Sequence, residues 1–322
     1  MRKSLPFGLK TENLLSLGAL VVLFVLSSIA SPYFLQLRNL LNILKQVSFS
    51  GIIGLGMAFV IIAGGIDLSV GSMTAFIGAI AILIVNWLGG GFWAIAAAWI
   101  GAMILGAVAG LFNGILVTKG RVAAFIVTLG TMAIFRSLTL YIGNAGQFIS
   151  NSDAYGNMGM SSVLGVPTAV WVFFILAFLL SGLLNRTRYG RYVCAVGSNE
   201  KVAAYAAIDI DKIRMLTYVI TGVMVGVSAV LLSSRMNSVN SSDTAANFEM
   251  DAIAAVVIGG TPMTGGRGTV WGVVIGAVII GMINNMLNML SVSAYLQGTV
   301  KGLVIIAAVF IQRGSARSRN GG

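Results

Sequence analysis

The chain has 322 residues, of which 57% are hydrophobic and only 9% are charged, whereas soluble domains carry about 25% charged residues. This composition excludes a soluble globular protein and indicates an integral membrane protein. The formal net charge of +11 would suggest nucleic-acid binding in a soluble protein, but here the basic residues lie in short loops between apolar runs. We therefore expect contact with membrane lipid and no nucleic-acid partner.

The chain contains no histidine and a single cysteine, Cys194, which limits its chemistry. Metal sites made of His and Cys, disulfides within the chain and general bases that depend on His are excluded. Most of its nine acidic residues lie in loops between the apolar runs. We therefore expect no catalytic residue, no metal and no cofactor, and a function other than that of an enzyme.

Apolar segments recur along the whole chain at lengths near 20 residues, which predicts membrane-spanning helices rather than the shorter alternating strands of a barrel. The expected fold class is all-α: a polytopic membrane helix bundle of about 8–10 transmembrane helices in a single domain, residues 1–322. The first segment resembles a signal peptide, but its length favours an uncleaved helix. The predicted spans are 13–31, 46–63, 71–88, 92–118, 122–143, 166–184, 215–234, a short segment at 251–260, 269–290 and 293–312.

Basic residues indicate the side of the membrane on which each loop lies, because Lys and Arg accumulate in cytoplasmic loops. With ten spans, four basic groups share one side, which predicts a cytoplasmic N-terminus (1–12), loop (185–214) and tail (313–322). Arg38 and Lys45 fall on the opposite side, in an amphipathic stretch compatible with a position along the membrane surface. The four groups are Arg2, Lys3 and Lys10; Lys119 and Arg121; Arg186, Arg188, Arg191, Lys201, Lys212 and Arg214; and Arg313, Arg317 and Arg319.

Two apolar runs are interrupted by glycine and polar residues: "VIIAGGIDLSVGSMTAF" (60–76) and "AVVIGGTPMTGGRGTVWGVVIGA" (255–277). Interrupted segments in corresponding places of two halves are typical of transporters with internal repeats. Irregular backbone at membrane depth is tolerated only where protein or a water-filled cavity satisfies it. We therefore predict broken helices in two related halves, with Gly64-Gly65 matching Gly259-Gly260. The structural glycines are Gly64, Gly65, Gly71, Gly259, Gly260, Gly265, Gly266 and Gly268.

Two acidic residues near these interruptions have a functional and a structural interpretation. Asp67, with Ser69, either lines a path or gate or caps the helix that resumes at about Leu68, and the capping role is favoured. Asp251 is either a carboxylate at a helix N-terminus or a partner for Lys301 in the last span, because charges within a membrane usually have a partner. The spacing alone leaves both questions open.

Three asparagines in "GMINNMLNML" are spaced to share one face of the ninth span. They either line a polar translocation path or form hydrogen bonds between helices, with equal weight. The candidate residues for a translocation path or gate are Asp67, Ser69, Thr261, Asn284, Asn285 and Asn288.

The predicted cytoplasmic loop, "NRTRYGRYVCAVGSNEKVAAYAAIDIDKIR" (185–214), is the most informative polar segment. Asn199 and Glu200 predict the start of a short helix with Val202, Ala203 and Ala206 on one side. A short rigid helix between two spans suits a pore on which a soluble motor pushes. The alternative is an amphipathic surface helix without a partner.

Four blocks of the chain resemble the bacterial ribose-type permeases, the membrane subunits of ATP-binding-cassette importers for monosaccharides such as ribose, xylose, arabinose and galactose. The blocks are "GGIDLSVGS", "TRYGRYVCAVGSNEKVAAYAAIDIDKIR", "DAIAAVVIGGTPMTGGRGTVWGVVIGA" and "NNMLNMLSVSAYLQGTVKGLVIIAAVFIQ". They occur in the family's order, and the resemblance covers residues 37–312. The last block favours ribose over the other sugars.

The resemblance implies a homodimeric or pseudo-dimeric pore in the bacterial inner membrane, a periplasmic sugar-binding protein and a cytoplasmic ATPase. The chain has no phosphate-binding loop of the form G-x-x-x-x-G-K-[ST], so ATP would be hydrolysed by a separate subunit. The resemblance also implies that the helix within 199–208 couples the permease to the ATPase. The implied coupling residues are Asn199, Glu200, Val202, Ala203 and Ala204.

The sequence departs from the family's pattern in two places. Ala207 stands where the family often has glycine, and "NSVNSSDTAANFEM" (237–250) replaces an outer loop that usually contains Gln-Pro. Two other functions remain open at this point. An ion-coupled secondary sugar transporter would rely on Asp67 and Asp251, and an ATP-binding-cassette permease for another small solute would differ only in substrate.

Overall fold

The computed structural model describes residues 11–293, 296–303 and 306, and this part of the chain is almost entirely α-helical. It confirms an all-α polytopic membrane bundle. The last predicted span, 293–312, lies partly outside the described residues, of which 296–303 are helical. Seven described helices are long and apolar enough to cross a membrane: α2 (Leu37–Ile62), α3 (Val70–Trp87), α4 (Phe92–Thr118), α5 (Ala124–Ile142), α7 (Thr168–Arg186), α10 (Ile210–Met236) and α12 (Val270–Met289).

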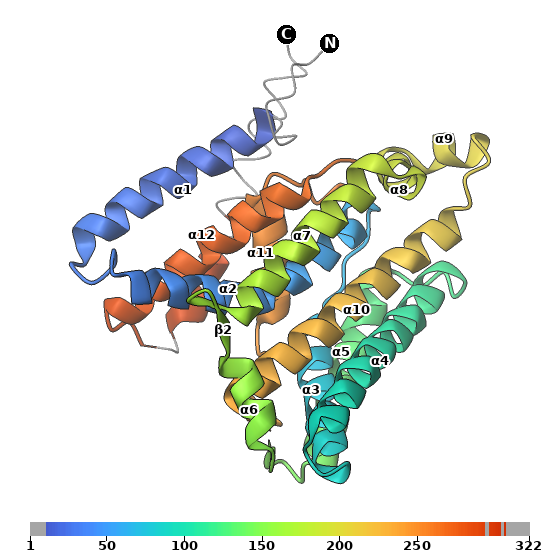
Figure 1. Ribbon diagram of the computed structural model, residues 1–322. Helices are drawn as coiled ribbons and strands as arrows, with labels where there is room; N and C mark the ends of the chain where they lie inside the picture. Colours follow the sequence, from blue (N-terminus) through green and yellow to red (C-terminus); the bar gives the residue numbers. More distant parts are fainter. Residues whose placement is uncertain (1–10, 294–295, 304–305, 307–322) are drawn as a thin grey trace.

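The bundle has two ends that differ in structure (Figure 1). The first, here the α8 end, carries α8 (Arg188–Ser198) and α9 (Glu200–Tyr205). The second, here the α6 end, carries α6 (Asp153–Met160) and a pairing of β1 (Gln147–Ile149) with β4 (Ser238–Asn240). The remaining elements are α1 (Thr11–Ala30), α11 (Phe248–Ile258), β2 (Ser162–Val163) and β3 (Val166–Pro167).

The second span is longer than predicted, because α2 begins at Leu37 rather than at residue 46. Ile43 and Val47, four residues apart, are both buried, so the face of the helix that packs in the core extends well before the predicted start. Arg38 and Lys45 therefore belong to the first turns of α2 and do not form a separate surface stretch.

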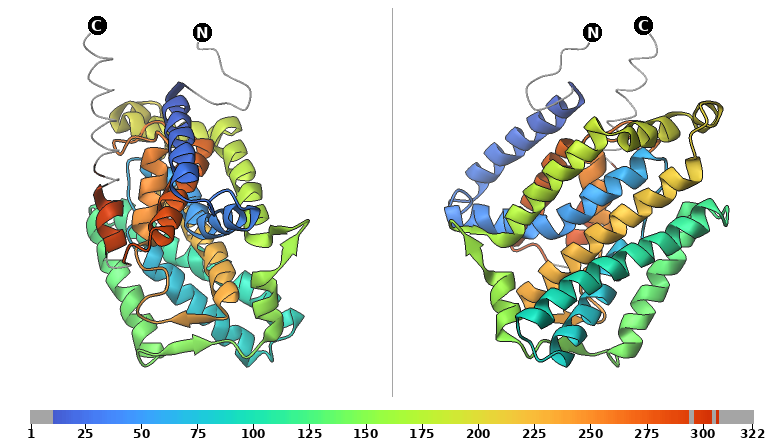
Figure 2. Two further views of the ribbon diagram at one scale, coloured as in Figure 1. Left: turned by 90° about the vertical axis from the view of Figure 1, so that its left-hand side faces the viewer. Right: turned by 45° about the vertical axis from the view of Figure 1, so that its right-hand side comes forward.

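Helices α4 and α10 lie side by side along most of their lengths (Figure 2). A Cβ atom on Gly106 would meet the carbonyl oxygen of Gly222, and a Cβ atom on Gly222 would meet the carbonyl oxygen of Gly106. Small residues at such crossings let helix backbones approach closely within a membrane. The spacing Gly106, Gly110, Gly114 was the sequence signal for this contact, and the sequence analysis did not use it.

Candidate functional site

The helices that precede the two interruptions, α2 and α11, end in the same way. Gly64 follows α2 with φ 83° and Gly260 follows α11 with φ 94°. At each end, the N–H groups of this glycine and of the next residue, Gly65 or Thr261, donate hydrogen bonds to the last turn of the helix. Both ends are Schellman motifs, which place glycine in the left-handed position. Gly64 therefore corresponds to Gly260, one residue away from the predicted match with Gly259.

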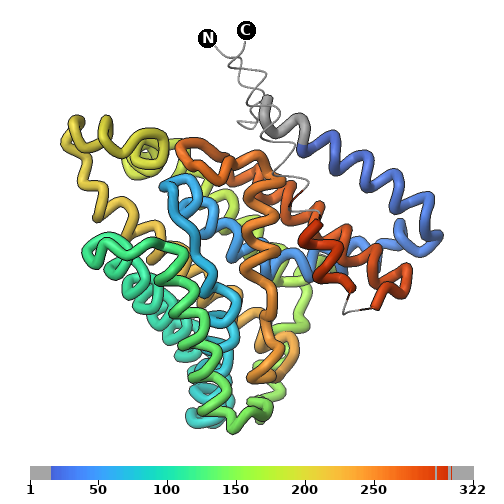
Figure 3. The backbone as a smooth tube through the Cα atoms, turned by 180° about the vertical axis from the view of Figure 1, so that it is seen from behind, coloured from blue at the N-terminus to red at the C-terminus, as the bar shows by residue number. Residues whose placement is uncertain are grey.

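The two interruptions meet each other and α8 at the α8 end, where the chain leaves α2 (Figure 3). The Gly266 N–H donates to the Ile62 carbonyl oxygen at 2.8 Å, and the Ser198 hydroxyl donates to the Gly266 carbonyl oxygen at 3.2 Å. A Cβ atom on Gly197 would overlap the Ile62 carbonyl oxygen, and one on Gly265 would lie 2.9 Å from it. These five residues, here the junction, pack backbone against backbone, so α8 cannot shift without moving both interruptions.

Arg214 of α10 connects α9 to the first interruption. Its Nη2 donates to Glu200 Oε2 at 2.7 Å, and its Nε donates to the Ala63 carbonyl oxygen at 3.3 Å. Tyr218, one helical turn further along, donates to the Ile66 carbonyl oxygen at 3.1 Å. The sequence analysis did not identify this connection; the spacing of four residues between Arg214 and Tyr218 places them on one face of α10 and was its only signal.

Helix α9 begins as predicted, because Asn199 Oδ1 accepts a hydrogen bond from the Val202 N–H at 3.1 Å. Ala203 is buried, whereas the neighbouring Ala204 is exposed, Val202 is 60% exposed and Tyr205 is 90% exposed. The prediction that Val202 and Ala203 lie on one side is wrong, because adjacent helical positions are about 100° apart. Tyr205, which the sequence analysis did not single out, dominates the exposed apolar surface of α9.

The end of α9 shows the backbone conformation of Ala207, where the resemblance predicts glycine. Ala207 has φ 55°, and the N–H groups of Ala207 and Ile208 donate to the carbonyl oxygens of Ala204 and Ala203 at 3.0 and 3.1 Å. This is again a Schellman motif, with alanine in the left-handed position that glycine usually occupies. A residue with a Cβ atom is strained there by roughly 1–2 kcal/mol, so the family's glycine has a conformational reason.

Asp67 is fully buried between α2 and α3 and does not cap α3 as predicted, because α3 begins at Val70 with Ser69 in the N-cap position. Asp67 Oδ1 accepts hydrogen bonds from the Ser69 N–H at 2.9 Å and the Ser69 hydroxyl at 2.6 Å. Asn113 of α4 donates to Ser69 Oγ at 3.0 Å and to Asp67 Oδ2 at 3.4 Å. This network holds the extended segment against α4, which supports a structural role for Asp67 and Ser69.

The remaining predicted residues of the interruptions also serve packing. Thr261 is fully buried, and a Cβ atom on Gly268 would lie 2.6 Å from its hydroxyl oxygen. A Cβ atom on Gly71 would overlap the carboxylate of Glu249, so this glycine lets α3 approach α11. These glycines bring the interrupted segments close to their neighbours.

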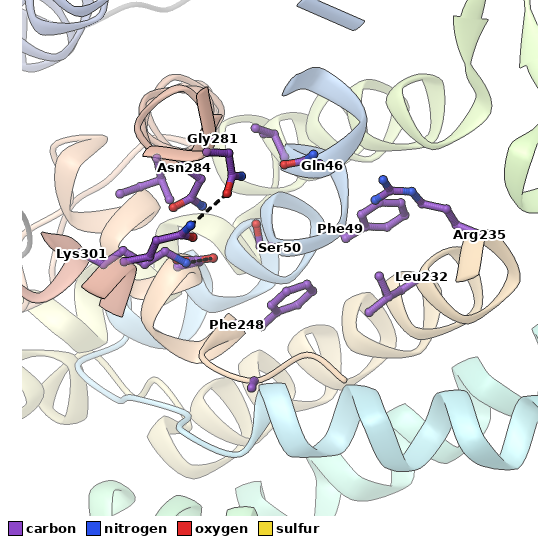
Figure 4. Close-up of a pocket in the computed structure, with 15 residues that line it drawn as sticks. Gln46, Phe49, Ser50, Leu232, Arg235, Phe248, Gly281, Asn284 and Lys301 are labelled. Carbon is purple, nitrogen blue, oxygen red and sulfur yellow. Dashed lines mark hydrogen bonds and ion pairs between the residues drawn. The ribbon is translucent and has the colours of Figure 1, made fainter. Parts of the chain in front are cut away.

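A cavity of about 280 Å³ lies near the C-terminal end of α10, between α2, α10, α11, α12 and the helical residues 296–303 (Figure 4). Asn284 and Asn288 line it, which favours the polar-path interpretation for these two residues. Asn285 instead is buried and exchanges hydrogen bonds of 2.9 and 3.2 Å with Asn39 of α2. Asn284 and Asn288 therefore fit the interpretation as a polar path, and Asn285 fits the interpretation as a hydrogen bond between helices.

Asp251 and Lys301 line the same cavity and form an ion pair, with Lys301 Nζ 3.0 Å from Asp251 Oδ1. Their side chains are 9% and 17% exposed, so the pair is largely removed from solvent. Both interpretations of Asp251 hold in the structure, because Asp251 lies in the first turn of α11 and is also the partner of Lys301.

The chain was compared with known proteins. Residues 39–309 match the family model described as the branched-chain amino acid transport system / permease component. The chain is 41% identical over 300 residues to the ribose import permease protein of Escherichia coli (strain K12), covering 92% of each chain. It is 41% identical over 297 residues to the ribose import permease protein of Bacillus subtilis (strain 168), covering 91% of this chain and 90% of that one.

A third relative is the L-arabinose transport system permease protein of Escherichia coli (strain K12), 30% identical over 317 residues, with 97% of this chain and 94% of that one covered. The resemblance to ribose-type permeases is thus confirmed over nearly the whole chain. The chain belongs to the branched-chain amino acid transport system / permease component family of multi-pass membrane transport proteins.

Proposed function

We propose that this chain is the membrane-spanning permease subunit of an ATP-binding-cassette importer that carries a monosaccharide, with ribose favoured, across the bacterial inner membrane. Permeases named for the import of ribose and the transport of D-allose are 41% and 38% identical to it over 92% and 91% of its length. The observation that carries the proposal is the exposed helix α9, which Glu200 and Arg214 connect to the first interrupted segment.

In this proposal the α8 end faces the cytoplasm, because most basic residues of the connecting loops lie there. Residues 1–322 form one transmembrane domain, with both termini cytoplasmic and residues 185–214 as the coupling loop. A periplasmic sugar-binding protein delivers the sugar at the α6 end, and a second copy of the chain completes the pore in the lipid bilayer. The chain itself catalyses no reaction, and a separate cytoplasmic ATPase supplies the free energy.

The junction offers a mechanical route from the ATPase to the membrane. A force on α9 reaches Ala63 through Glu200 and Arg214, and a force on α8 reaches the carbonyl oxygen of Ile62 through the close approach of Gly197. Both routes lead to backbone in the first interrupted segment, at Ala63 and at Ile62. The coupling residues in this account are Asn199, Glu200, Val202, Ala203 and Ala204, together with Tyr205.

The ion-coupled alternative is less favoured. Such a carrier needs a carboxylate that is free to bind the coupling ion within the membrane. Asp67 accepts hydrogen bonds from Ser69 and Asn113, and Asp251 is paired with Lys301. A permease for another small solute is the second candidate function, because the description of the matching family model names branched-chain amino acid transport.

Substitution of Tyr205 by aspartate tests the coupling surface. A buried tyrosine at the centre of an interface often contributes about 2 kcal/mol or more to binding, so we expect Tyr205→Asp to reduce ATPase binding at least about tenfold. The measurement is the amount of ATPase that copurifies with the permease from native membranes in mild detergent. Leu164→Asp is the control, because Leu164 is 89% exposed at the α6 end. Equal recovery of ATPase with both variants, or no ATPase with the wild type under any nucleotide condition, would contradict the proposal.

A further inference from the structure

The cavity near the C-terminal end of α10 contains hydrogen-bonding groups that the protein itself does not use. The side-chain oxygen of Asn284 is buried and has no hydrogen-bond partner in the described part of the chain. The Arg235 guanidinium lies over the Phe49 ring, 5.3 Å from its centroid, and donates no hydrogen bond among the described residues (Figure 4). A buried polar atom without a partner is costly in free energy, so the Asn284 oxygen favours a polar occupant. The partly buried Arg235 guanidinium provides hydrogen-bond donors to the same occupant.

The other residues that line the cavity favour a neutral occupant. The charges of Asp251 and Lys301 cancel in their ion pair, and the positive charge of Arg235 is partly offset by the face of Phe49. Phe248 adds a second aromatic ring to the lining, so the cavity combines apolar faces with amide and hydroxyl groups. A monosaccharide presents the matching surface, with hydroxyl groups at its edge and C–H groups on its faces.

The size of the cavity limits the occupant further. Its volume of about 280 Å³ is just below the range of small-molecule pockets, which is about 300–1,000 Å³. One sugar ring with its hydroxyl groups fits this range better than an oligosaccharide or a nucleotide.

We propose that this cavity is a low-affinity subsite for a neutral monosaccharide, in which Asn284 accepts a hydrogen bond from a sugar hydroxyl and Arg235 donates one to a sugar oxygen. This inference rests on the proposed function, since it identifies where the transported sugar pauses within each permease chain. Low affinity is required, because a transported solute must leave the site as readily as it enters.

Binding of ribose to the purified permease–ATPase complex in nanodiscs, without binding protein, tests the subsite. Saturation-transfer NMR detects weak binding of D-ribose at millimolar concentration. We expect Asn284→Leu to weaken binding by about three- to tenfold, the range for one lost hydrogen bond between neutral groups. Ser50→Leu, which narrows the cavity from α2, is expected to have a similar or larger effect. Asn185→Leu is the control, because Asn185 is exposed on α7 and, within the described part of the chain, its side chain bonds only Ser181 of its own helix.

The outcomes separate the subsite from the proposed function. If the wild type shows ATP-driven ribose uptake in proteoliposomes but Asn284→Leu and Ser50→Leu, each with a wild-type size-exclusion profile, bind ribose as the wild type and the Asn185→Leu control do, the subsite is wrong and the importer stands. If the wild type shows no ATP-driven sugar uptake, the proposed function fails. Stronger displacement of ribose by ribose 5-phosphate than by unlabelled ribose would identify an anion site and overturn the inference.

Discussion

Replacing Gly222 by valine is expected to lower the free energy of unfolding of the bundle by about 3 kcal/mol or more, the upper part of the range for overpacking. Even a Cβ atom at this position would overlap the carbonyl oxygen of Gly106, and backbone cannot rotate away as a side chain can. Helices α4 and α10 would have to separate. The apparent melting temperature in detergent should fall by roughly 6 °C or more, measured by the loss of the monodisperse size-exclusion peak on heating.

Gly182→Val is the matched control for this prediction. Gly182 lies within the span α7, and a Cβ atom there would meet no other atom of the described residues within 4 Å. The same substitution therefore adds the same side chain without a clash, and we expect a melting temperature close to that of the wild type. Equal melting temperatures of the two variants would show that the close contact between α4 and α10 does not determine the stability of the bundle.

Arg214→Leu is expected to separate ATP hydrolysis from transport. The substitution removes both the ion pair with Glu200 and the hydrogen bond to the Ala63 carbonyl oxygen. Coupling free energies between sites are about 1–3 kcal/mol, or 5–150-fold, so we expect about tenfold less sugar uptake per ATP hydrolysed. Because Arg214 and Glu200 are 25% and 49% exposed, the fold itself should lose no more than about 1 kcal/mol.

The control for Arg214 is Arg121→Leu at the same end of the bundle. Arg121 also forms an ion pair with an acidic residue, Asp211, at 3.2 Å, but it is 70% exposed and bonds no interrupted segment. We expect uptake per ATP close to the wild-type value, measured with labelled ribose in proteoliposomes that contain permease, ATPase and binding protein. If both variants reduce this ratio equally, the loss reflects surface charge and not the connection through Arg214.

The spans were predictable wherever apolar length alone defines a helix. The predicted 71–88 and 92–118 agree with α3 and α4 to within one residue, because both are bounded by polar or glycine-rich turns. Helix α6 carried a signal in its capping residue Ser152, whose hydroxyl oxygen accepts a hydrogen bond from the Tyr155 N–H. Strand β1 was not predictable, because it depends on pairing with β4, with Gln147 opposite Asn240. A stretch rich in Asn, Ser and Gly carries no signal for so distant a partner.

In the candidate site, too, features set by local sequence were predictable and features set by distant contacts were not. The Schellman glycines were visible as Gly-Gly pairs, and the start of α9 followed from the capping residue Asn199. The separation of Asn285 from Asn284 was not predictable, since it depends on Asn39 lying opposite on α2. The exposure of Tyr205 likewise depends on which side of α9 packs against the bundle, and six residues are too few for periodicity to decide this.

In the proposed function, ATP hydrolysed by a separate subunit drives sugar through this chain. The most direct test uses proteoliposomes with permease, ATPase and sugar-loaded binding protein, in which ionophores remove proton and sodium gradients. We expect labelled ribose to accumulate when ATP is supplied to the ATPase and not to accumulate without it. Accumulation driven by a proton or sodium gradient in the absence of ATP would contradict this function. Asp67 and Asp251 would then be the candidate residues for ion coupling.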